Sequence, residues 1–422
     1  MDQAGLRPDG RRLGKLAAPG PRVADPAGDH PHRTAAGRGR DPGRRLAQRR
    51  PATQRPRLDG HDGGPIVAAG ESPSDACVRV VPTMRDTALS IQGPPGTGKT
   101  TTAARTVLDL VAAGKRVGIT SNSHKAILNL LVKCAWLNGA ALRCLKVGGD
   151  ADDPLLASIP GVQHVAGGRD AAAVSRDHAL VGGTAWLFCR PDMRQAVDDL
   201  FVDEAGQVSV ANLVAMGGAA RNLVLVGDQM QLGQPTQAKH PEESGESTLE
   251  YLLQAERTVP VDAGVFLDTT YRLHPEICRV NSEAFYEGKL HSAPGCENRE
   301  IRVPGGGAGV LARGSGIVFV PVEHEGNTQG SDEEAEVVRE IFEALQGLEH
   351  TGVDGKVVGR LGVEDVLVVA PYTCRCGSSA TCCRRGRVWG RWTSFRGRRR
   401  LLSSFQCVPA RGMIRRGVSS FC

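Results

Sequence analysis

The segment Gly-Pro-Pro-Gly-Thr-Gly-Lys-Thr at residues 93–100 constrains the fold of this 422-residue chain more than any other feature. It matches the pattern G-x-x-x-x-G-K-[ST], follows a short apolar run at 87–92 and precedes apolar residues at helical spacing in 99–113. In that context the glycines let backbone N–H groups wrap phosphates, and the helix N-terminus adds the positive end of its dipole. We therefore predict an α/β fold whose first loop binds a nucleoside triphosphate.

Two side chains of this loop have particular expected roles. Lys99 supplies a charge for the β- and γ-phosphates, and Thr100 offers its hydroxyl to Mg²⁺. The alternative is a Gly/Pro turn of coincidental sequence, which the flanking strand and helix patterns disfavour. The expected nucleotide-binding residues are Gly93, Pro94, Pro95, Gly96, Thr97, Gly98, Lys99, Thr100 and Thr101.

A second set of ligands is expected at the end of a neighbouring strand. Residues 200–207 read Leu-Phe-Val-Asp-Glu-Ala-Gly-Gln, so Asp203 and Glu204 directly follow an apolar run. Asp203 can hold Mg²⁺ through water, and Glu204 can orient and deprotonate an attacking water. The alternative, an acidic turn without function, is disfavoured by the position of this pair after both the loop and a strand.

Further apolar runs alternate with helical patterns along the chain, which indicates a parallel sheet with crossover helices. The helix expected at 331–348 opens with Ser331 and acidic residues, which suit a helix N-terminus. We predict strands at 87–92, 115–121, 179–188, 198–205, 222–228, 316–322 and 364–372, and helices at 99–113, 125–137 and 331–348.

The two ends of the chain differ from its middle in composition. Residues 1–60 hold 14 Lys and Arg, six Asp and no Glu, and residues 1–47 lack periodic apolar patterning, so we predict disorder there. No apolar run approaches the ~20 residues of a membrane span, and a signal-peptide pattern is absent. Cysteines in the body are scattered, as is typical of reduced cytosolic thiols, so a cytoplasmic location is expected.

Six segments in a characteristic order make the chain resemble the superfamily-one nucleic-acid helicases. The closest likeness is to the branch that contains the nonsense-decay and Okazaki-fragment helicases, whose bacterial members are sometimes fused to a RecB-like nuclease. No nuclease carboxylate–lysine cluster is identifiable in this sequence. The segments are 93–100 (motif I), 120–131 (motif Ia), 182–188, 202–207 (motif II), 225–235 (motif III) and 269–290 (motif IV).

The resemblance implies two RecA-like domains with ATP and Mg²⁺ between them and single-stranded DNA or RNA lying across both. By the same likeness, Gln229 senses the γ-phosphate, and Arg272 reaches it from the other side of the cleft as an arginine finger. With Lys99, Asp203 and Glu204, these two complete the expected catalytic set. The expected nucleic-acid contacts are Ser121, Asn122, Ser123, His124 and Thr184.

Several of these residues have a plainer interpretation. Arg272 could be a surface or salt-bridge arginine, and His124 a solvated loop histidine. The family reads adenine with a glutamine upstream of motif I, but residues 75–92 offer only Gln92, which is too close to the loop. Aromatic residues are 4% of the chain, and we expect no base-stacking platform. The aromatic side chains expected to pack rather than stack are Tyr271, Phe285 and Tyr286.

After Tyr372 the sequence departs from the family pattern, and residues 374–422 hold 12 Arg and no acidic residue. A one-base frame change explains this tail. Choosing one base per codon decodes 373–377 to Asn-Met-Gln-Val-Arg, and 393–407 to a string beginning Asp-Lys-Phe-Gln-Gly-Gln-Glu, as in motif V. We therefore predict that a nucleotide was lost near the codon for Thr373, and that motifs V and VI are missing. Cysteine pairs in the tail are then no metal site.

The predicted function is Mg²⁺-dependent ATP binding and hydrolysis of helicase type on single-stranded nucleic acid, impaired by the missing motifs. The alternatives are a catalytically inactive nucleotide- and nucleic-acid-binding fragment, and a P-loop enzyme that moves no nucleic acid, such as a kinase or switch GTPase. The expected organisation is a low-complexity segment at 1–74, a RecA-like ATPase domain at 75–260, a linking segment at 261–315, the start of a second RecA-like domain at 316–373 and a disordered, out-of-frame tail at 374–422.

Overall fold

The computed structural model describes most of the chain between residues 55 and 369. The predictions for residues 1–47 and for nearly all of 374–422 fall outside the described residues. No helix in the described part is both long and apolar enough to span a membrane. The described ranges are 55–140, 142–167, 175–233, 240–304, 311–325, 331–369 and, for the backbone alone, 403–406.

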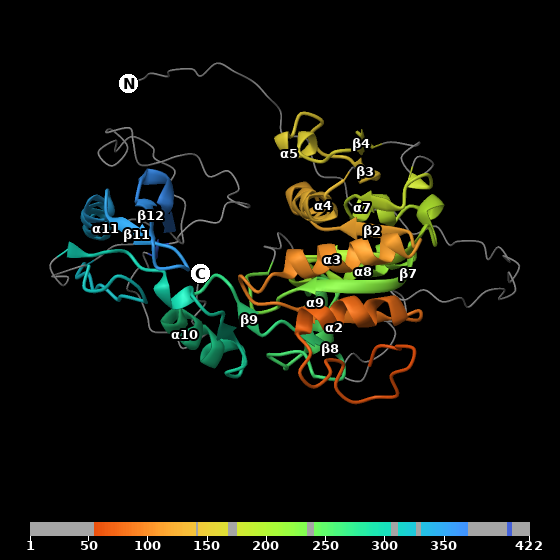
Figure 1. Cartoon of the computed structure of the whole chain (residues 1–422), viewed down its shortest axis with the longest axis horizontal. Helices are drawn as coiled ribbons and strands as arrows, with labels where there is room; N and C mark the ends of the chain where they lie inside the picture. The colour runs from red at the N-terminus through yellow and green to blue at the C-terminus, as the bar shows by residue number, and fades with distance from the viewer. Residues whose placement is uncertain are drawn as a thin grey trace, which may run out of the picture. The chain divides into compact units, whose positions relative to one another are not determined.

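An eight-stranded sheet forms the centre of the fold, in the order β4-β3-β5-β2-β6-β7-β1-β8 (Figure 1). Every pairing in it is parallel, so all eight strands end at the same edge. The strands are β1 (Ala88–Gln92), β2 (Val117–Thr120), β3 (Cys144–Val147), β4 (Val162–Val165), β5 (Leu180–Gly182), β6 (Val197–Asp203), β7 (Ala220–Gly227) and β8 (Gly264–Phe266).

Helices cover both faces of this sheet because its strands are apolar on both sides. In β7, Leu223 and Leu225 pack into one core cluster, and Val224 and Val226 into the other. The expected α/β fold is therefore confirmed. The face that contains Val224 and Val226 is covered by α2 (Pro73–Val80), α3 (Lys99–Ala112) and α4 (His124–Asn138), with α5 (Pro154–Ala157) beside α4. The face that contains Leu223 and Leu225 is covered by α7 (Ala185–Phe188), α8 (Val210–Gly217) and α9 (Thr248–Leu253).

Two predicted strands are wrong in whole or in part. Residues 179–188 form only the short strand β5, and after Gly183 the chain turns into helix α7. An apolar run of this length does not distinguish strand from helix. Residues 316–322 form no strand in the described structure, and Phe319 is 87% exposed. Alternating apolar residues give strand propensity, but a strand also needs a partner to receive its hydrogen bonds.

Residues 55–74, which we expected to belong to the low-complexity segment, are part of the folded unit. Ile66 is buried in the same core cluster as α2, and Leu58 forms an antiparallel bridge with Met84. Arg79 in α2 forms an ion pair with Glu71 and donates to the Ile66 carbonyl. Two isolated apolar anchors are too sparse to produce a periodic signal, so this packing could not be predicted from the sequence.

The segment after β8 builds smaller units of its own. Helix α10 (Pro275–Phe285) packs beside a two-stranded pair, β9 (Thr269–Thr270) and β10 (His291–Ser292). A separate core gathers around α11 (Asp332–Leu345), whose N-cap is Ser331 as predicted, with β11 (Glu349–Thr351) and β12 (Val357–Arg360). Strand β13 (Val366–Val369) pairs in parallel with β14 (Ser403–Gln406), which lies in the segment predicted to be out of frame.

Candidate nucleotide and nucleic-acid site

The loop at 93–98 has the shape that phosphate binding requires. Gly96 and Gly98 take φ values of 79° and 81°, which side chains rarely adopt, and Gly98 is the N-cap of α3. A Cβ at Gly93 would overlap the Lys99 side chain and lie 2.8 Å from Thr97 Oγ1. The Lys99 ammonium donates to the Gly93 carbonyl, and Thr97 Oγ1 donates to the Pro94 carbonyl over 2.8 Å. The loop is thus closed on itself, with its lysine lying over it.

The segment that carries Arg272 lies directly against this loop. The Tyr271 N–H donates to the Gly96 carbonyl over 2.9 Å, and Thr270 Oγ1 donates to the Pro95 carbonyl over 2.9 Å. A Cβ at Gly96 would lie 2.7 Å from Thr270 Oγ1 and closer still to the Cβ of Arg272. The Arg272 side chain is exposed, and no ion pair to it is found among the described residues. Of the two plainer interpretations of Arg272, a surface arginine agrees with this exposure, while a salt bridge has no support in the described part of the chain.

Asp203 and Glu204 lie at the same edge of the sheet, but their strand is not the immediate neighbour of β1. Strand β7 lies between β6 and β1, so the expected adjacency is wrong. Asp203 pairs across to Val226 and is 7% exposed, and Glu204 has a left-handed φ of 56°. A non-glycine residue in this region stores strain of roughly 1–2 kcal/mol, which commonly marks functional turns.

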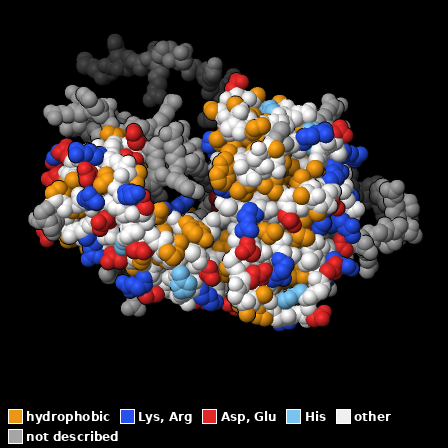
Figure 2. Space-filling view, viewed as in Figure 1, with side chains coloured by type: hydrophobic (Ala, Val, Ile, Leu, Met, Phe, Trp, Pro, Cys, Tyr) orange, Lys and Arg blue, Asp and Glu red, His pale blue; other side chains and the backbone are white. Residues whose placement is uncertain are grey.

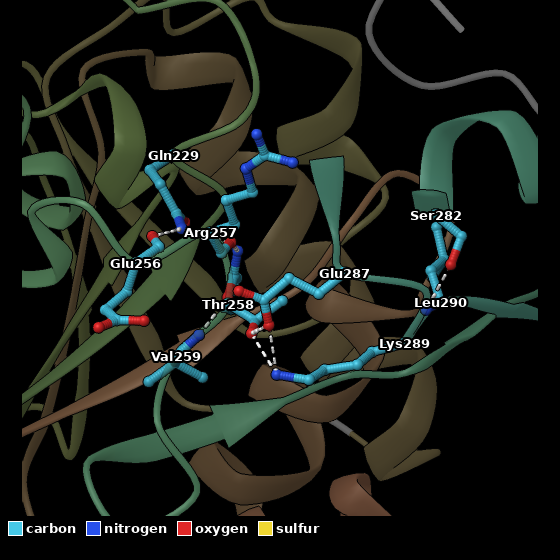
Figure 3. Close-up of polar contacts among 10 residues, drawn as sticks. Gln229, Glu256, Arg257, Thr258, Val259, Ser282, Glu287, Lys289 and Leu290 are labelled. Atoms are coloured by element: carbon cyan, nitrogen blue, oxygen red, sulfur yellow. Dashed lines mark hydrogen bonds and ion pairs between the residues drawn. The ribbon is translucent and has the colours of Figure 1, made fainter. Parts of the chain in front are cut away.

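Gln229 follows β7 and is turned toward a loop beyond the sheet (Figure 3). Its Nε2 donates to the carbonyls of Arg257, over 2.9 Å, and Glu256, over 3.4 Å. The fully buried Gln92 also donates to the Arg257 carbonyl over 2.9 Å, and its Oε1 accepts from the Val259 N–H. Gln92 is thus a structural residue, in agreement with its exclusion as an adenine reader.

The loop at 256–259 is in turn held by residues that follow α10. Thr258 Oγ1 donates to the Glu287 carboxylate over 2.7 Å, and the Lys289 ammonium donates to both Thr258 Oγ1 and Glu287 over 2.6 Å (Figure 3). Tyr286 is buried, and its hydroxyl donates to Asp228 beside Gln229 over 2.8 Å. These contacts, which the sequence did not indicate, connect motif III to motif IV.

The residues expected to contact nucleic acid meet where β2 and β5 end. These strands are neighbours, and the Gly183 N–H donates to the Ile119 carbonyl, so Thr184 lies beside residues 121–124. Ser121 is 3% exposed, and its Oγ has no hydrogen-bond partner among the described groups. Asn122 donates to the Gln207 carbonyl. The N-cap of α4 is Ser123, and that of α7 is Thr184.

His124 is not a solvated loop residue. It is the first residue of α4, and its Nδ1 lies 3.0 Å from the Nζ of Lys146, a residue of β3 that is 1% exposed. Burial lowers the pKa of His124, and the charges of Lys146 and His164 add to that effect. Burial also lowers the pKa of Lys146 to about 8. Lys146 escaped the sequence analysis because one lysine within a short apolar run gives no distinctive pattern.

Three further aromatic side chains of the described part are largely exposed, and one of them was expected to pack. Tyr271, expected to pack, is 62% exposed, while Tyr286 and Phe285 pack into the small core around α10 as predicted. Trp186 is 82% exposed and follows Thr184 by two residues; Trp136, at 71%, has the Lys133 ammonium 4.0 Å from its ring centroid. On the face in view in Figure 2, basic and acidic side chains are intermixed.

The residues around the loop suit Mg²⁺. Thr100 lies in the first turn of α3, and the Asp203 carboxylate lies at the same edge of the sheet. Among the described residues there is no cluster of three or more His, Cys, Asp or Glu that could hold a metal. Mg²⁺ needs none, because it binds one or two protein oxygens together with substrate phosphates and water. The donor set is therefore compatible with a nucleotide-bound Mg²⁺.

Two protein-family models, both described as AAA domain, match residues 75–166 and 244–377. The chain is 30% identical over 231 residues to the DNA replication ATP-dependent helicase/nuclease DNA2 of Gallus gallus, covering 53% of this chain and 23% of that protein. It is 27% identical over 249 residues to the Regulator of nonsense transcripts 1 homolog of Drosophila melanogaster, covering 50% of this chain and 21% of that protein. The chain thus spans about a fifth of the length of these curated relatives.

Among solved structures, the complex of Arterivirus nonstructural protein 10 (helicase) with DNA matches at 18% identity, over 49% of this chain and 41% of that chain. Its TM-score is 0.33, which is too low to carry any argument. The sequence matches cover the phosphate loop in one segment and Arg272 in the other. Together with the parallel α/β sheet, the family models and the relatives support a superfamily-one helicase.

Proposed function

We propose that this chain binds Mg²⁺ and ATP at the loop 93–100 and hydrolyses ATP slowly while bound to single-stranded nucleic acid. The observation that carries the proposal is the direct contact between the loop and the segment 270–272. Two hydrogen bonds and a close packing at Gly96 hold Arg272 beside the phosphate site. An arginine so placed can stabilise the charge that develops on the γ-phosphate during transfer.

In the proposed reaction, Lys99 binds the β- and γ-phosphates, and Thr100 and Asp203 hold Mg²⁺. Mg²⁺ held by these residues would supply charge neutralisation for the phosphates. Glu204 accepts the proton of the attacking water, and Gln229 leaves the Arg257 carbonyl to contact the γ-phosphate. Single-stranded DNA or RNA crosses the edge formed by residues 121–124 and Thr184, where the N-terminus of α4 favours phosphate.

We further propose that turnover is low because motifs V and VI are replaced by the tail after Thr373. The second family match ends at residue 377, a few residues beyond the proposed frame change. An arginine finger alone can be worth ~10³-fold in such chemistry, so a missing arginine of motif VI would be costly. The proposed compartment is the cytoplasm, where thiols stay reduced, and the six cysteines of the described part are free.

The test is ATP hydrolysis by the purified chain, with and without a single-stranded oligonucleotide, beside the variant Lys99→Ala. Stimulation by the oligonucleotide that disappears in Lys99→Ala is the expected result. A rate equal to that of Lys99→Ala under all conditions, with nucleotide and oligonucleotide binding retained, would favour the second candidate, a catalytically inactive binding fragment. The predicted loss of motifs V and VI is what favours this second candidate.

A further inference from the structure

The ammonium group of Lys146 is buried inside the fold, so it cannot contact a ligand directly. Its Nζ contacts three acceptors, His124 Nδ1 at 3.0 Å and the carbonyls of Val147 and Gly148 at 2.9 and 2.6 Å. A lysine ammonium has three N–H donors and no acceptor. All three donors are therefore used, and the side chain can act on a ligand only through His124.

The contact with Lys146 determines which nitrogen of His124 carries the ring proton. Because the ammonium can only donate, Nδ1 of His124 must accept, and the proton of the neutral ring then resides on Nε2. In a protonated ring the Nδ1–H would face an N–H of Lys146, and two donors cannot form a hydrogen bond with each other. The lowered pKa of His124 has the same direction, since it keeps the ring neutral at ordinary pH.

The backbone holds the His124 ring against Lys146. Gly148 and Gly149 turn beside it with φ values of 71° and 86°. A Cβ at Gly148 would lie 3.1 Å from Cε1 of the ring, and one at Gly149 would lie 3.2 Å from Cγ. The two glycines thus leave just enough room for the imidazole, and no hydrogen bond to Nε2 is found among the described residues. The first turn of α4 contains no acidic residue that would compete for this N–H.

We propose that Lys146 is a positioning residue, which holds His124 as the neutral Nε2–H tautomer so that Nε2–H and the first N–H groups of α4 donate to one phosphate of single-stranded nucleic acid. This inference rests on the proposed function. The unpartnered, buried hydroxyl of Ser121 lies at the same loop and offers a further donor. The titratable groups that act on His124 are Lys146 of β3 and His164 of β4, and Asp153 acts on Lys146. The phosphate contact is then made by a neutral ring.

The tautomer can be read directly by long-range ¹H–¹⁵N NMR of the full chain without nucleic acid. His124→Asn assigns the signals by difference. We expect the Nε2–H pattern for His124 at pH 6.5 in the wild-type chain. A predominant Nδ1–H pattern, or an imidazolium pattern at that pH, would overturn the proposal, and this measurement remains decisive even if variants of Lys146 fail to fold.

The functional consequence is measured as the affinity for a 20-nucleotide oligo-dT or oligo-U at pH 6.0 and 7.2 and fixed salt. Lys146→Met keeps the length of the side chain but removes its donors and its charge, so the pKa of His124 rises, although the larger lowering by burial remains. For each protein the affinity at pH 6.0 is divided by the affinity at pH 7.2. We expect this ratio to be roughly threefold larger for Lys146→Met than for wild type, because His124 gains a charge at the lower pH. Lys125→Met, at the same helix end, should weaken binding equally at both pH values.

The outcomes separate the two proposals. The same ratio of affinities in wild type and Lys146→Met would exclude a positioning role for Lys146. A failure of the wild-type chain to bind either oligonucleotide would refute the proposed function, while the NMR experiment would still decide the tautomer.

Discussion

Replacing Gly96 with alanine should separate Arg272 from the phosphate loop. The added Cβ would lie 2.7 Å from Thr270 Oγ1 and 3.3 Å from the backbone nitrogen of Arg272, where ordinary van der Waals contacts are about 3.4–4 Å. The Cβ of Arg272 is nearer still, and backbone atoms cannot rotate away as a flexible side chain can. The segment 270–272 must therefore move by roughly 1 Å, and a displacement of that size at a reacting group can cost 10²-fold in rate.

The general destabilisation by an alanine at positive φ has to be distinguished from this displacement. Gly114→Ala is a matched control, because Gly114 has the same φ of 79° as Gly96 but has no atom within 4 Å of an added Cβ. Both variants bear the left-handed penalty of roughly 1–2 kcal/mol in stability. Only Gly96→Ala should lower kcat for ATP hydrolysis, by about 10²-fold.

The assay combines steady-state hydrolysis with equilibrium binding of a fluorescent ATP analogue. We expect the affinity of Gly96→Ala for nucleotide to fall by less than tenfold, since Lys99 and the helix N-terminus remain in place. A kcat of Gly96→Ala equal to that of Gly114→Ala would refute the reasoning, because Arg272 would then contribute nothing from this position.

Four further predictions follow from the described residues. Asp203→Asn should lower kcat by at least about 10²-fold and weaken the dependence of ATP binding on Mg²⁺, measured by Mg²⁺ titration; an unchanged titration would exclude Asp203 as a metal residue. The pKa of Lys146 falls from 10.5 unfolded to about 8 folded, so its destabilising effect is full below pH 8 and relieved by pH 10.5. The free energy of unfolding of wild type should therefore rise by about 3 kcal/mol relative to Lys146→Met across that range in urea titrations, and parallel curves would contradict the buried charge. Trp186 fluorescence should be quenched by an oligonucleotide and that of Trp136 should not, tested with each tryptophan replaced by phenylalanine in turn; equal quenching of both would argue against the proposed edge. Sequencing the DNA around the codon for Thr373 should reveal a one-base fix that restores motif V, and an intact frame without such a fix would end that hypothesis.

Short motifs with local geometry were predictable from the sequence. The loop 93–100 fixes its own shape through glycines at positive φ, and β1 and α3 on either side follow from simple periodicity. Asp203 could be placed at a strand end because apolar residues precede it. That β7 separates its strand from β1 could not be foreseen, because strand order depends on long-range pairing that no local pattern encodes.

Contacts between distant segments account for what the sequence missed. Gln92 was correctly excluded as an adenine reader, yet its bonds to residues 257–259 join positions more than 160 apart in the chain. In the sequence Lys146 is an ordinary strand residue. Only the folded structure places His124 of α4 against it. The strand predicted at 316–322 is the opposite case. Its local apolar pattern is present, but no pairing partner for it is found in the described structure.

The carbonyl of Arg257 accepts from both Gln92 and Gln229, so moving Gln229 away from it costs free energy. A carbonyl oxygen has two lone pairs, and the amides of Gln92 and Gln229 occupy both. If Gln229 contacts the γ-phosphate as proposed, it would give up its bond to the Arg257 carbonyl, worth about 1 kcal/mol, and the new contact would have to return at least this much. After this departure the loop 256–259 is still held by Gln92, by the Glu287–Lys289 pair and by the Arg257 guanidinium, which donates to the Ala284 carbonyl. Binding of ATP would thus change the mobility of the turn after α10, without any large movement of either segment.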